Sequence, residues 1–589
     1  MTVEEPGTGS TRRDFLKGAG LAGLGVIAGS ASTGVSAAVA TVLVDVPASS
    51  ADAYAHSGGV PASSLNFGRI FPNLPPFAEA SDKVREALMA VGMQGGVLDA
   101  RDDLAAGPTA LIVDPTVNGN PTSANPYGTN PDNPTMTAGS TFVGQFTDHD
   151  ITFDQTSQLG VPQNPLTSPN TRTPALDLDS VFGGGPAIRP DLYVQNPDGS
   201  VGPKLKIGTG GVHEDVPRTP NADGSYSALL GDPRDDENLV IAGLHCAHIL
   251  FYNRVLDELD DHDWRGFPVA REGEGTRYAA FLRARQVTQW HYQWLLVNEH
   301  LPQIAGQAMV NDVLTHGNRF YNPPRGDAFM PIEFGGAAYR FGHSMVRPSY
   351  RANFSSGTGD STSPTKDPFF GLVFDPSIPA SQFSAPPSFD RDDLLGGYPA
   401  PRRYIGWQTF FDFGDGQVKN NKKIDTTISS VLFTLPVPAI APHTQTSPTV
   451  LPQRNLLRQL TWSLPSGQDA ARAMGITPLT GTPLADLGQV YTPFATSTPL
   501  WYYVLAEAKA TTGGLTLGPV GGRIVVETLI GLLRADRDSY LRNNPRFQPF
   551  LGSDLKLGSN PNPNITGNRA YTRAHFLYYA NVVNPGTYR

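Results

Sequence analysis

Two long stretches that are almost free of glycine and proline constrain the fold most. Residues 236–259 contain one glycine, Gly243, and residues 276–304 contain one proline, Pro302, near their end. Apolar side chains recur at helical spacing in both stretches, as at Leu239, Leu244, Ile249 and Leu256 in the first and at Phe281, Val287, Trp290, Trp294 and Leu295 in the second. The pattern predicts two long buried helices. Further helices are predicted at 79–92, 455–463, 500–509 and 522–541, while runs of strict alternation are few, so we expect a mainly α fold with little sheet.

The composition indicates a large folded core with long ordered loops. The chain has 589 residues, of which 39% are hydrophobic, with 29 Phe and 20 Tyr. Its 62 Gly and 53 Pro make up about a fifth of the chain, below the ~25–30% typical of low-complexity sequences. We expect three parts: a signal peptide at 1–40, a loop-rich arm at 41–140, and one large domain of packed helices with long loops at 141–589.

Charge and cysteine content exclude two classes of protein. The formal net charge is −10, and no stripe of clustered Lys and Arg is present to neutralise phosphates, so nucleic acid is excluded as a partner. Cys246 is the single cysteine, which excludes intramolecular disulfides and a cysteine-rich metal cluster.

The N-terminus carries an export pattern. Residues 11–17, TRRDFLK, match the twin-arginine motif and precede a weakly apolar, Gly/Ala-rich stretch at 18–40. A membrane-anchor helix is the alternative, but this stretch holds too much Gly and Ser for the roughly 20 firmly apolar residues of a span. Cleavage is expected after Ala40, with a competing site at Ser36 and Ala37. We therefore expect a secreted or periplasmic protein that passes through the twin-arginine export machinery and has no membrane span in its mature form.

The segment 144–150, GQFTDHD, is the most informative for chemistry. It places His149 between two carboxylates, which alone would suggest a solvated acidic turn. Its flanks are apolar, however, with Phe142, Val143, Phe146, Ile151 and Phe153 on either side. The segment is thus expected to enter a core, where charged groups are costly and tend to be ligated or functional.

This segment resembles the distal-histidine segment of the animal-type haem peroxidase superfamily, which includes myeloperoxidase, lactoperoxidase and the cyclooxygenases. Three more blocks follow in the family's order: residues 231–238, GDPRDDEN, resemble its distal-arginine segment, residues 339–344, YRFGHS, its proximal-histidine segment, and residues 455–458, NLLR, its proximal support. The resemblance covers about residues 140–480. It implies a large, mainly helical haem-peroxidase domain that binds a b-type haem.

On one haem face, the resemblance implies that His343 binds the iron and that Asn455 is the hydrogen-bond partner of its ring. Arg340 and Arg458 are implied as partners of the haem propionates, since a guanidinium matches a carboxylate and remains charged.

On the other face, the resemblance implies that His149 transfers the proton of hydrogen peroxide, for which an imidazole with an unperturbed pKa near ~6.5 is suited. Arg234 would stabilise the charge that develops as the O–O bond breaks, and Gln145 would hold water or a halide nearby. A ferryl haem would result and then oxidise a small donor, a halide or a pseudohalide.

Two carboxylates stand where the mammalian peroxidases form ester bonds to haem methyl groups. Asp148 and Glu237 match these positions, and the alternative for each is an ordinary buried hydrogen-bonding acid. Asn238 stands where myeloperoxidase has a methionine that makes a third link, which argues against efficient chloride oxidation and leaves bromide, iodide, thiocyanate or phenols as donors.

A calcium site is also implied. In the family, the acid after the distal histidine points away from it, and a following loop supplies further oxygen ligands, of which a calcium ion takes 6–8. The matching ligands in this chain are Asp150, Thr173, Ala175, Asp177 and Asp179. Asp179 replaces the more usual serine, and an acidic surface loop is the alternative interpretation.

Two other functions use the same fold: a haem-dependent fatty-acid dioxygenase, and a non-catalytic secreted adhesion or binding protein. Cyclooxygenase-type enzymes have a tyrosine three residues before the proximal histidine, where this chain has Arg340, with Tyr339 one place off. A binding protein would not need residues for both haem faces. A peroxidase acting on hydrogen peroxide is therefore favoured. His245 and His248 lack a suitably spaced third ligand for zinc, so we expect both as core or supporting residues.

Overall fold

Helices dominate the part of the chain that the structure describes. The computed structural model describes residues 66–211, 213–259, 276–353, 369–377, 392–436, 448–553 and 571–582. The predicted signal peptide and residues 41–65 of the predicted arm lie outside the described residues. The prediction of a mainly α fold is confirmed.

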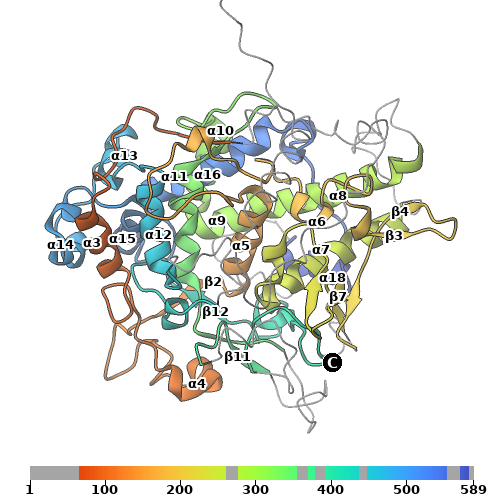
Figure 1. Cartoon of the computed structure of the whole chain (residues 1–589), viewed down its shortest axis with the longest axis horizontal. Coiled ribbons are helices and arrows are strands. Elements are labelled where there is room, and N and C mark those ends of the chain that lie inside the picture. Colours follow the sequence, from red (N-terminus) through yellow and green to blue (C-terminus); the bar gives the residue numbers. More distant parts are fainter. Residues whose placement is uncertain are drawn as a thin grey trace, which may run out of the picture.

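The central helices form one continuous body (Figure 1). Helix α5 (Gly139–Ile151) contacts α7 (Leu239–Asp257), and α7 contacts α8 (Thr276–Leu295). The chain leaves α8 through a π-helical turn, η6 (Leu296–His300), and continues into α9 (Leu301–Ala305) and α10 (Gln307–His316). By length and composition α7 could cross a membrane, but most of it is buried inside this fold, as a core helix would be.

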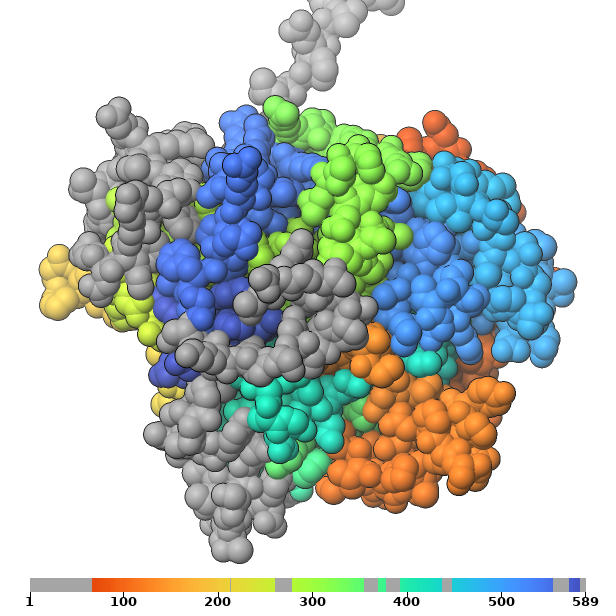
Figure 2. All heavy atoms as spheres, turned by 180° about the vertical axis from the view of Figure 1, so that it is seen from behind, coloured from red at the N-terminus to blue at the C-terminus, as the bar shows by residue number. Residues whose placement is uncertain are grey.

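A second group of helices packs beside the first. It comprises α3 (Asp82–Val91), α12 (Leu451–Thr461), α13 (Gly467–Ala473), α14 (Ala485–Val490), α15 (Leu500–Thr512) and α16 (Pro519–Ala535). Helix α12 contacts α3 and α15, while α16 contacts α9 and α10 and so joins the two groups. The rear view shows α13 and α14, in light blue, along one edge of the molecule (Figure 2). Short helices complete the described part: α4 (Gly107–Val113), α6 (Asp179–Phe182), α11 (Ile332–Gly335), α17 (Tyr540–Asn543) and α18 (Arg573–Tyr579).

The strands of the described residues form two-stranded pairs only. One pair is parallel, β1 (Phe67–Gly68) with β9 (Met330–Pro331). The others are antiparallel: β2 (Asp132–Thr137) with β12 (Asn420–Lys422), β3 (Tyr193–Gln195) with β4 (Val201–Leu205), β5 (Gly208–Thr209) with β6 (Glu214–Asp215), β7 (Arg218–Pro220) with β8 (Tyr226–Ala228), and β10 (Ser349–Arg351) with β11 (Phe370–Leu372). These pairs fasten loops to the helical body.

Most predicted helices are present, with shifted ends. Helix α12 starts before the predicted 455 because Pro452 lies in its first turn, where a missing N–H costs nothing. Helix α16 ends at Ala535, before the predicted 541. Within the predicted arm, α4 is a second helix that was not predicted. Helix α5, which carries the GQFTDHD segment, was not predicted as a helix.

Candidate active site

Helix α5 supplies one wall of a cavity of about 250 Å³. Gln145, Asp148, His149 and Thr152 line it, and their spacing places them on one face at the end of the helix. The same cavity is lined by Arg340 and His343 from the 3₁₀ helix η7 (Ala338–Met345), and by Arg454 and Arg458 from α12. The structure thus brings the four resembling blocks of the sequence around one space.

His149 is held by a carboxylate that also holds a second histidine. His149 Nδ1 lies 2.7 Å from Asp235 Oδ1, and His245 Nδ1 lies 2.7 Å from Asp235 Oδ2. Burial raises the pKa of Asp235, but the hydrogen bonds from the two rings outweigh it, and the pKa falls below its usual value. Asp235 is therefore ionised at neutral pH and accepts from both rings, so His149 carries its proton on Nδ1 when neutral and leaves Nε2 without one.

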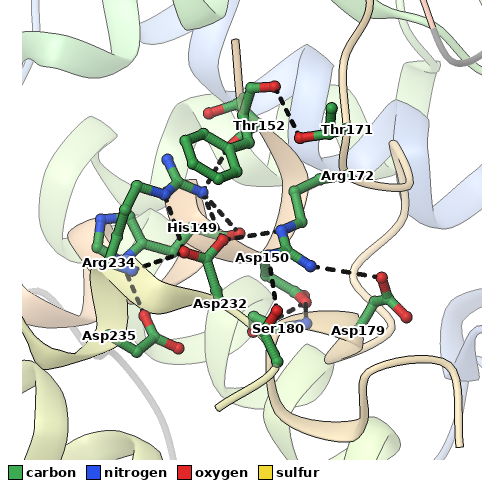
Figure 3. A network of polar contacts seen from close by, with 12 residues as sticks. His149, Asp150, Thr152, Thr171, Arg172, Asp179, Ser180, Asp232, Arg234 and Asp235 are labelled. Atoms are coloured by element: carbon green, nitrogen blue, oxygen red, sulfur yellow. Dashed lines mark hydrogen bonds and ion pairs between the residues drawn. The ribbon is translucent and has the colours of Figure 1, made fainter. Parts of the chain in front are cut away.

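Arg234 lines the same cavity but is anchored at its back (Figure 3). Its Nε and Nη2 donate to Asp232, at 3.1 and 2.8 Å, and Nη2 also donates to the carbonyl oxygens of His149 and Thr152. Burial lowers the pKa of Arg234, but the neighbouring carboxylate of Asp232 outweighs it and raises the pKa, so the cation persists. Asp232 is in turn held by Arg172, whose Nε lies 2.8 Å from its Oδ2.

His343, on η7, is kept neutral. Burial, followed by the charge of Arg340, lowers its pKa to about 3. Asn455 Nδ2 lies 2.7 Å from His343 Nδ1, while Asn455 Oδ1 is buried without a hydrogen-bond partner. Rotating the amide by half a turn would let Oδ1 accept from a protonated Nδ1, which is the tautomer that leaves Nε2 available to a metal.

Three guanidinium groups gather at one end of the cavity. Arg340 Nε donates to Gly335 O at 2.9 Å, and Arg458 donates to Asp154. Burial and then the charge of Arg458 lower the pKa values of both Arg340 and Arg454 to about 10. The mutual repulsion of these guanidinium groups indicates that this end of the cavity is a binding site for anionic groups.

The two carboxylates predicted to bind a haem covalently also line the cavity. Glu237 accepts a hydrogen bond from Gln145, and burial raises its pKa. Asp148 Oδ1 accepts from Thr152 Oγ1 at 2.9 Å. Asn238 lies beside them and caps α7, because its side-chain oxygen accepts from the backbone N–H groups of Val240 and Ile241.

Two of the predicted calcium ligands, Asp150 and Asp179, are shown in Figure 3. Asp150 accepts from the backbone N–H of Leu178 and Ser180, and Asp177 accepts from Thr173 Oγ1 and from the backbone of Asp179. Burial, and then the charges of Asp177 and Asp179, raise the pKa of Asp150 well above its usual value. Asp179 lies 3.6 Å from Arg172, and the described residues contain no group of three or more His, Cys, Asp and Glu arranged to hold a metal ion.

Sequence reasoning missed several members of this site. Asp235 went unnoticed although it follows Arg234 directly, and Arg454 went unnoticed although it lies one helical turn before Arg458. His245, expected only as a core or supporting residue, proves to be the second partner of Asp235. His248 is buried and stacks on Phe146 with ring centroids 4.4 Å apart.

Known proteins resemble part of this chain. Residues 154–372 match the animal haem peroxidase family. Human probable oxidoreductase PXDNL is 30% identical over 152 residues, covering 25% of this chain and 9% of that protein. Mouse thyroid peroxidase is 26% identical over 203 residues, covering 32% of this chain and 20% of that protein, so the chain matches less than a quarter of either relative's length.

Solved structures resemble the whole fold. A rice fatty acid alpha-dioxygenase, 14% identical, matches with a TM-score of 0.50 over 90% of this chain and 82% of that chain. Peroxidase A from Dictyostelium discoideum, 16% identical, matches with a TM-score of 0.47 over 76% of this chain and 87% of that chain. The rice structure confirms the fold class, and the family match confirms the resemblance over residues 154–372, which contain the blocks at 231–238 and 339–344.

Proposed function

We propose that the chain, whose residues 154–372 match the animal haem peroxidase family, is an exported haem peroxidase that reduces hydrogen peroxide and oxidises small donors, halides or pseudohalides. The observation that supports this most is the pair of histidines that line one cavity from two different elements, each with its own orienting partner. His149 has Asp235, and His343 has Asn455.

The residues of the cavity fit a haem. His343 is neutral, as an iron ligand must be. The buried side-chain oxygen of Asn455 has no hydrogen-bond partner and could accept a hydrogen bond from the His343 ring. The guanidinium groups of Arg340, Arg454 and Arg458 would pair with the two propionates, which would add negative charge to that of Asp154 at this end of the cavity. Bound there, the haem supplies the iron centre at which peroxide is reduced and donors are oxidised.

The side chains opposite His343 handle the proton of the peroxide. His149 receives it on Nε2, while Asp235 holds Nδ1 and stabilises the imidazolium that forms. The proton is then returned to the leaving oxygen. Arg234 contributes a fixed positive charge at the same wall, because Asp232 keeps its guanidinium in place.

Calcium and covalent attachment are further parts of the proposal. A divalent cation among Asp150, Asp177 and Asp179 would offset the repulsion that raises the pKa of Asp150, with the Thr173 hydroxyl and the Ala175 carbonyl as additional ligands. Asp148 and Glu237 line the haem cavity and are the candidates for ester links.

A spectroscopic experiment tests the haem assignment. Protein produced with haem available should show a Soret band, which His343→Ala should lose, while His316→Ala, at an exposed histidine on α10, should keep it. His149→Ala should retain the band but react with peroxide about 10²- to 10⁴-fold more slowly. A parent protein without a Soret band would contradict the proposal.

Export is tested separately. The double substitution Arg12→Lys and Arg13→Lys should keep the protein inside the producing cell, because the twin arginines are the recognised feature. Lys17→Arg, which changes a basic residue of the same motif without touching the pair, serves as the control. Unchanged export of the double variant would contradict the twin-arginine route.

A further inference from the structure

Two buried polar groups next to the cavity have unused hydrogen-bonding capacity: the first has no partner, and the second lies beside the side chain of Thr147. They are His300 Nε2, on the π-helical turn η6, and the Tyr339 hydroxyl, on η7. The exposed fractions of these residues are 2% and 7%. A buried polar atom without a partner costs about 1–3 kcal/mol, so such a pair indicates that something polar is normally bound between them. Local π-helical turns occur frequently at functional sites, which supports the same view.

Both atoms face Gly144 on α5. A Cβ atom built on Gly144 would lie 3.7 Å from His300 Nε2 and 3.8 Å from the Tyr339 hydroxyl oxygen. The absence of a side chain there therefore leaves room for about one or two heavy atoms in front of both groups. Gly144, His300 and Tyr339 all line the cavity described above, so a small molecule in it has access to this space.

The surroundings hold both groups in place. Tyr339 stacks on Phe334 with ring centroids 4.4 Å apart and an interplanar angle of 16°, which fixes the direction of its hydroxyl. His300 Nδ1 lies 3.3 Å from Ser140 Oγ, which fixes the other side of that ring. Neither side chain needs to move to receive a ligand.

The charges at this place select a neutral ligand. Burial, and then the charge of Arg573, lower the pKa of His300 to about 3, so its ring is neutral at physiological pH. Burial, and then the charge of Asp148, raise the pKa of Tyr339, so its hydroxyl keeps its proton. A neutral imidazole nitrogen and a phenol hydroxyl, which can both donate and accept, suit a hydroxyl group, and the opposite charges of Arg573 and Asp148 near them give no net preference for an ion.

We propose that Gly144, His300 and Tyr339 form a binding subsite for a small neutral hydroxylic molecule. Water, methanol and hydrogen peroxide belong to this class. The ligand's hydroxyl would bridge His300 Nε2 and the Tyr339 hydroxyl, one residue before Gln145 on α5. The identification of hydrogen peroxide as a natural ligand of this subsite rests on the proposed function. The binding of a hydroxylic molecule does not, because it needs no reaction at a haem.

Crystal structures of the protein as purified, soaked in methanol, test this inference. In the parent protein, the methanol oxygen should lie within hydrogen-bond distance of both His300 Nε2 and the Tyr339 hydroxyl. Gly144→Ala should lose this density, because its new methyl group occupies the same space. The added Cβ makes only ordinary contacts and alanine favours helix over glycine, so this variant should fold.

Tyr339→Phe provides a second variant, which should lose or displace the methanol because one of its two partners is gone. Tyr292→Phe is the matched control: it removes the hydroxyl of another buried tyrosine, which already contacts Thr147 Oγ1 at 3.4 Å, and methanol should remain. The inference is overturned if the parent crystal shows an empty space, a haem edge in front of Gly144, or methanol that persists in Gly144→Ala. A protein without a Soret band would contradict the proposed function, but the methanol soaks would still show whether the subsite exists.

Discussion

Replacing Asp235 by asparagine tests the central arrangement of the cavity. In the parent, one carboxylate accepts from His149 and from His245, at 2.7 Å each. The asparagine amide has the same shape but offers one oxygen acceptor and one NH2 donor. The ring that faces the NH2 group must therefore carry its proton on Nε2 instead of Nδ1. If that ring is His149, its Nε2 becomes protonated and can no longer receive the proton of the peroxide.

The size of the effect follows from these two outcomes. Loss of the general base costs about 10²- to 10⁴-fold in rate. If the amide oxygen stays on His149, the tautomer survives, but the ionic partner of the imidazolium is lost; hydrogen bonds to charged groups contribute about 1.5–3 kcal/mol, or roughly 10- to 100-fold. The rate of the peroxide reaction should therefore fall at least about tenfold, and up to about 10⁴-fold.

Stopped-flow measurement of the haem absorbance after mixing with hydrogen peroxide gives this rate directly. Asp236→Asn is the control, because Asp236 is the next acid along the chain and pairs with Arg218 instead of a histidine. The control should react at close to the parent rate. A folded Asp235→Asn protein whose rate is within threefold of the parent would refute the orienting role of Asp235.

Three further predictions concern the metal, the haem links and stability. Chelation of calcium should lower the melting temperature of the parent and have little effect on Asp177→Asn/Asp179→Asn, whose site is already impaired; equal effects on both proteins would argue against the site. Acidic acetone should leave haem attached to the parent protein and extract it from an Asp148→Asn/Glu237→Gln variant, whereas free extraction from the parent would show that the two acids are ordinary buried groups. Burial raises the pKa of Glu507 to about 7, so its contribution to stability is full below its unfolded pKa and is lost as pH rises through 7. The unfolding free energy of Glu507→Gln minus that of the parent should therefore increase by about 1–3 kcal/mol when the pH is raised from 5 to 8.5. Urea denaturation at the two pH values measures this difference. A difference that is the same at both pH values would exclude the charge of Glu507 as its cause.

The fold was predictable where a helix is long and its apolar residues are periodic. Helices α7 and α8 follow from such patterns in their own sequences. Helix α5 was not predicted, because its polar residues face the cavity and Asp150 faces the opposite loop, so the usual division into one apolar and one polar face is absent.

The site was predictable from resemblance rather than from spacing. Nothing in the sequence between His149 and His343 fixes how far apart the two rings will lie, since this depends on how α5, η7 and α12 pack. Asp235 shows the limit most clearly: an acid beside an arginine resembles a surface ion pair, and its role appears only when α7 carries His245 to its other oxygen.

The long sequence separations within the cavity also bear on how the protein is made. Asn455 and His343 are 112 residues apart, and Arg458 and Asp154, which close one end of the cavity, are 304 apart. A chain emerging from the ribosome cannot complete this cavity until α12 has been synthesised, and contacts of such range form slowly. A haem bound as proposed would accordingly be enclosed only late in biosynthesis, and until then the apolar surfaces of the earlier helices would be open to aggregation.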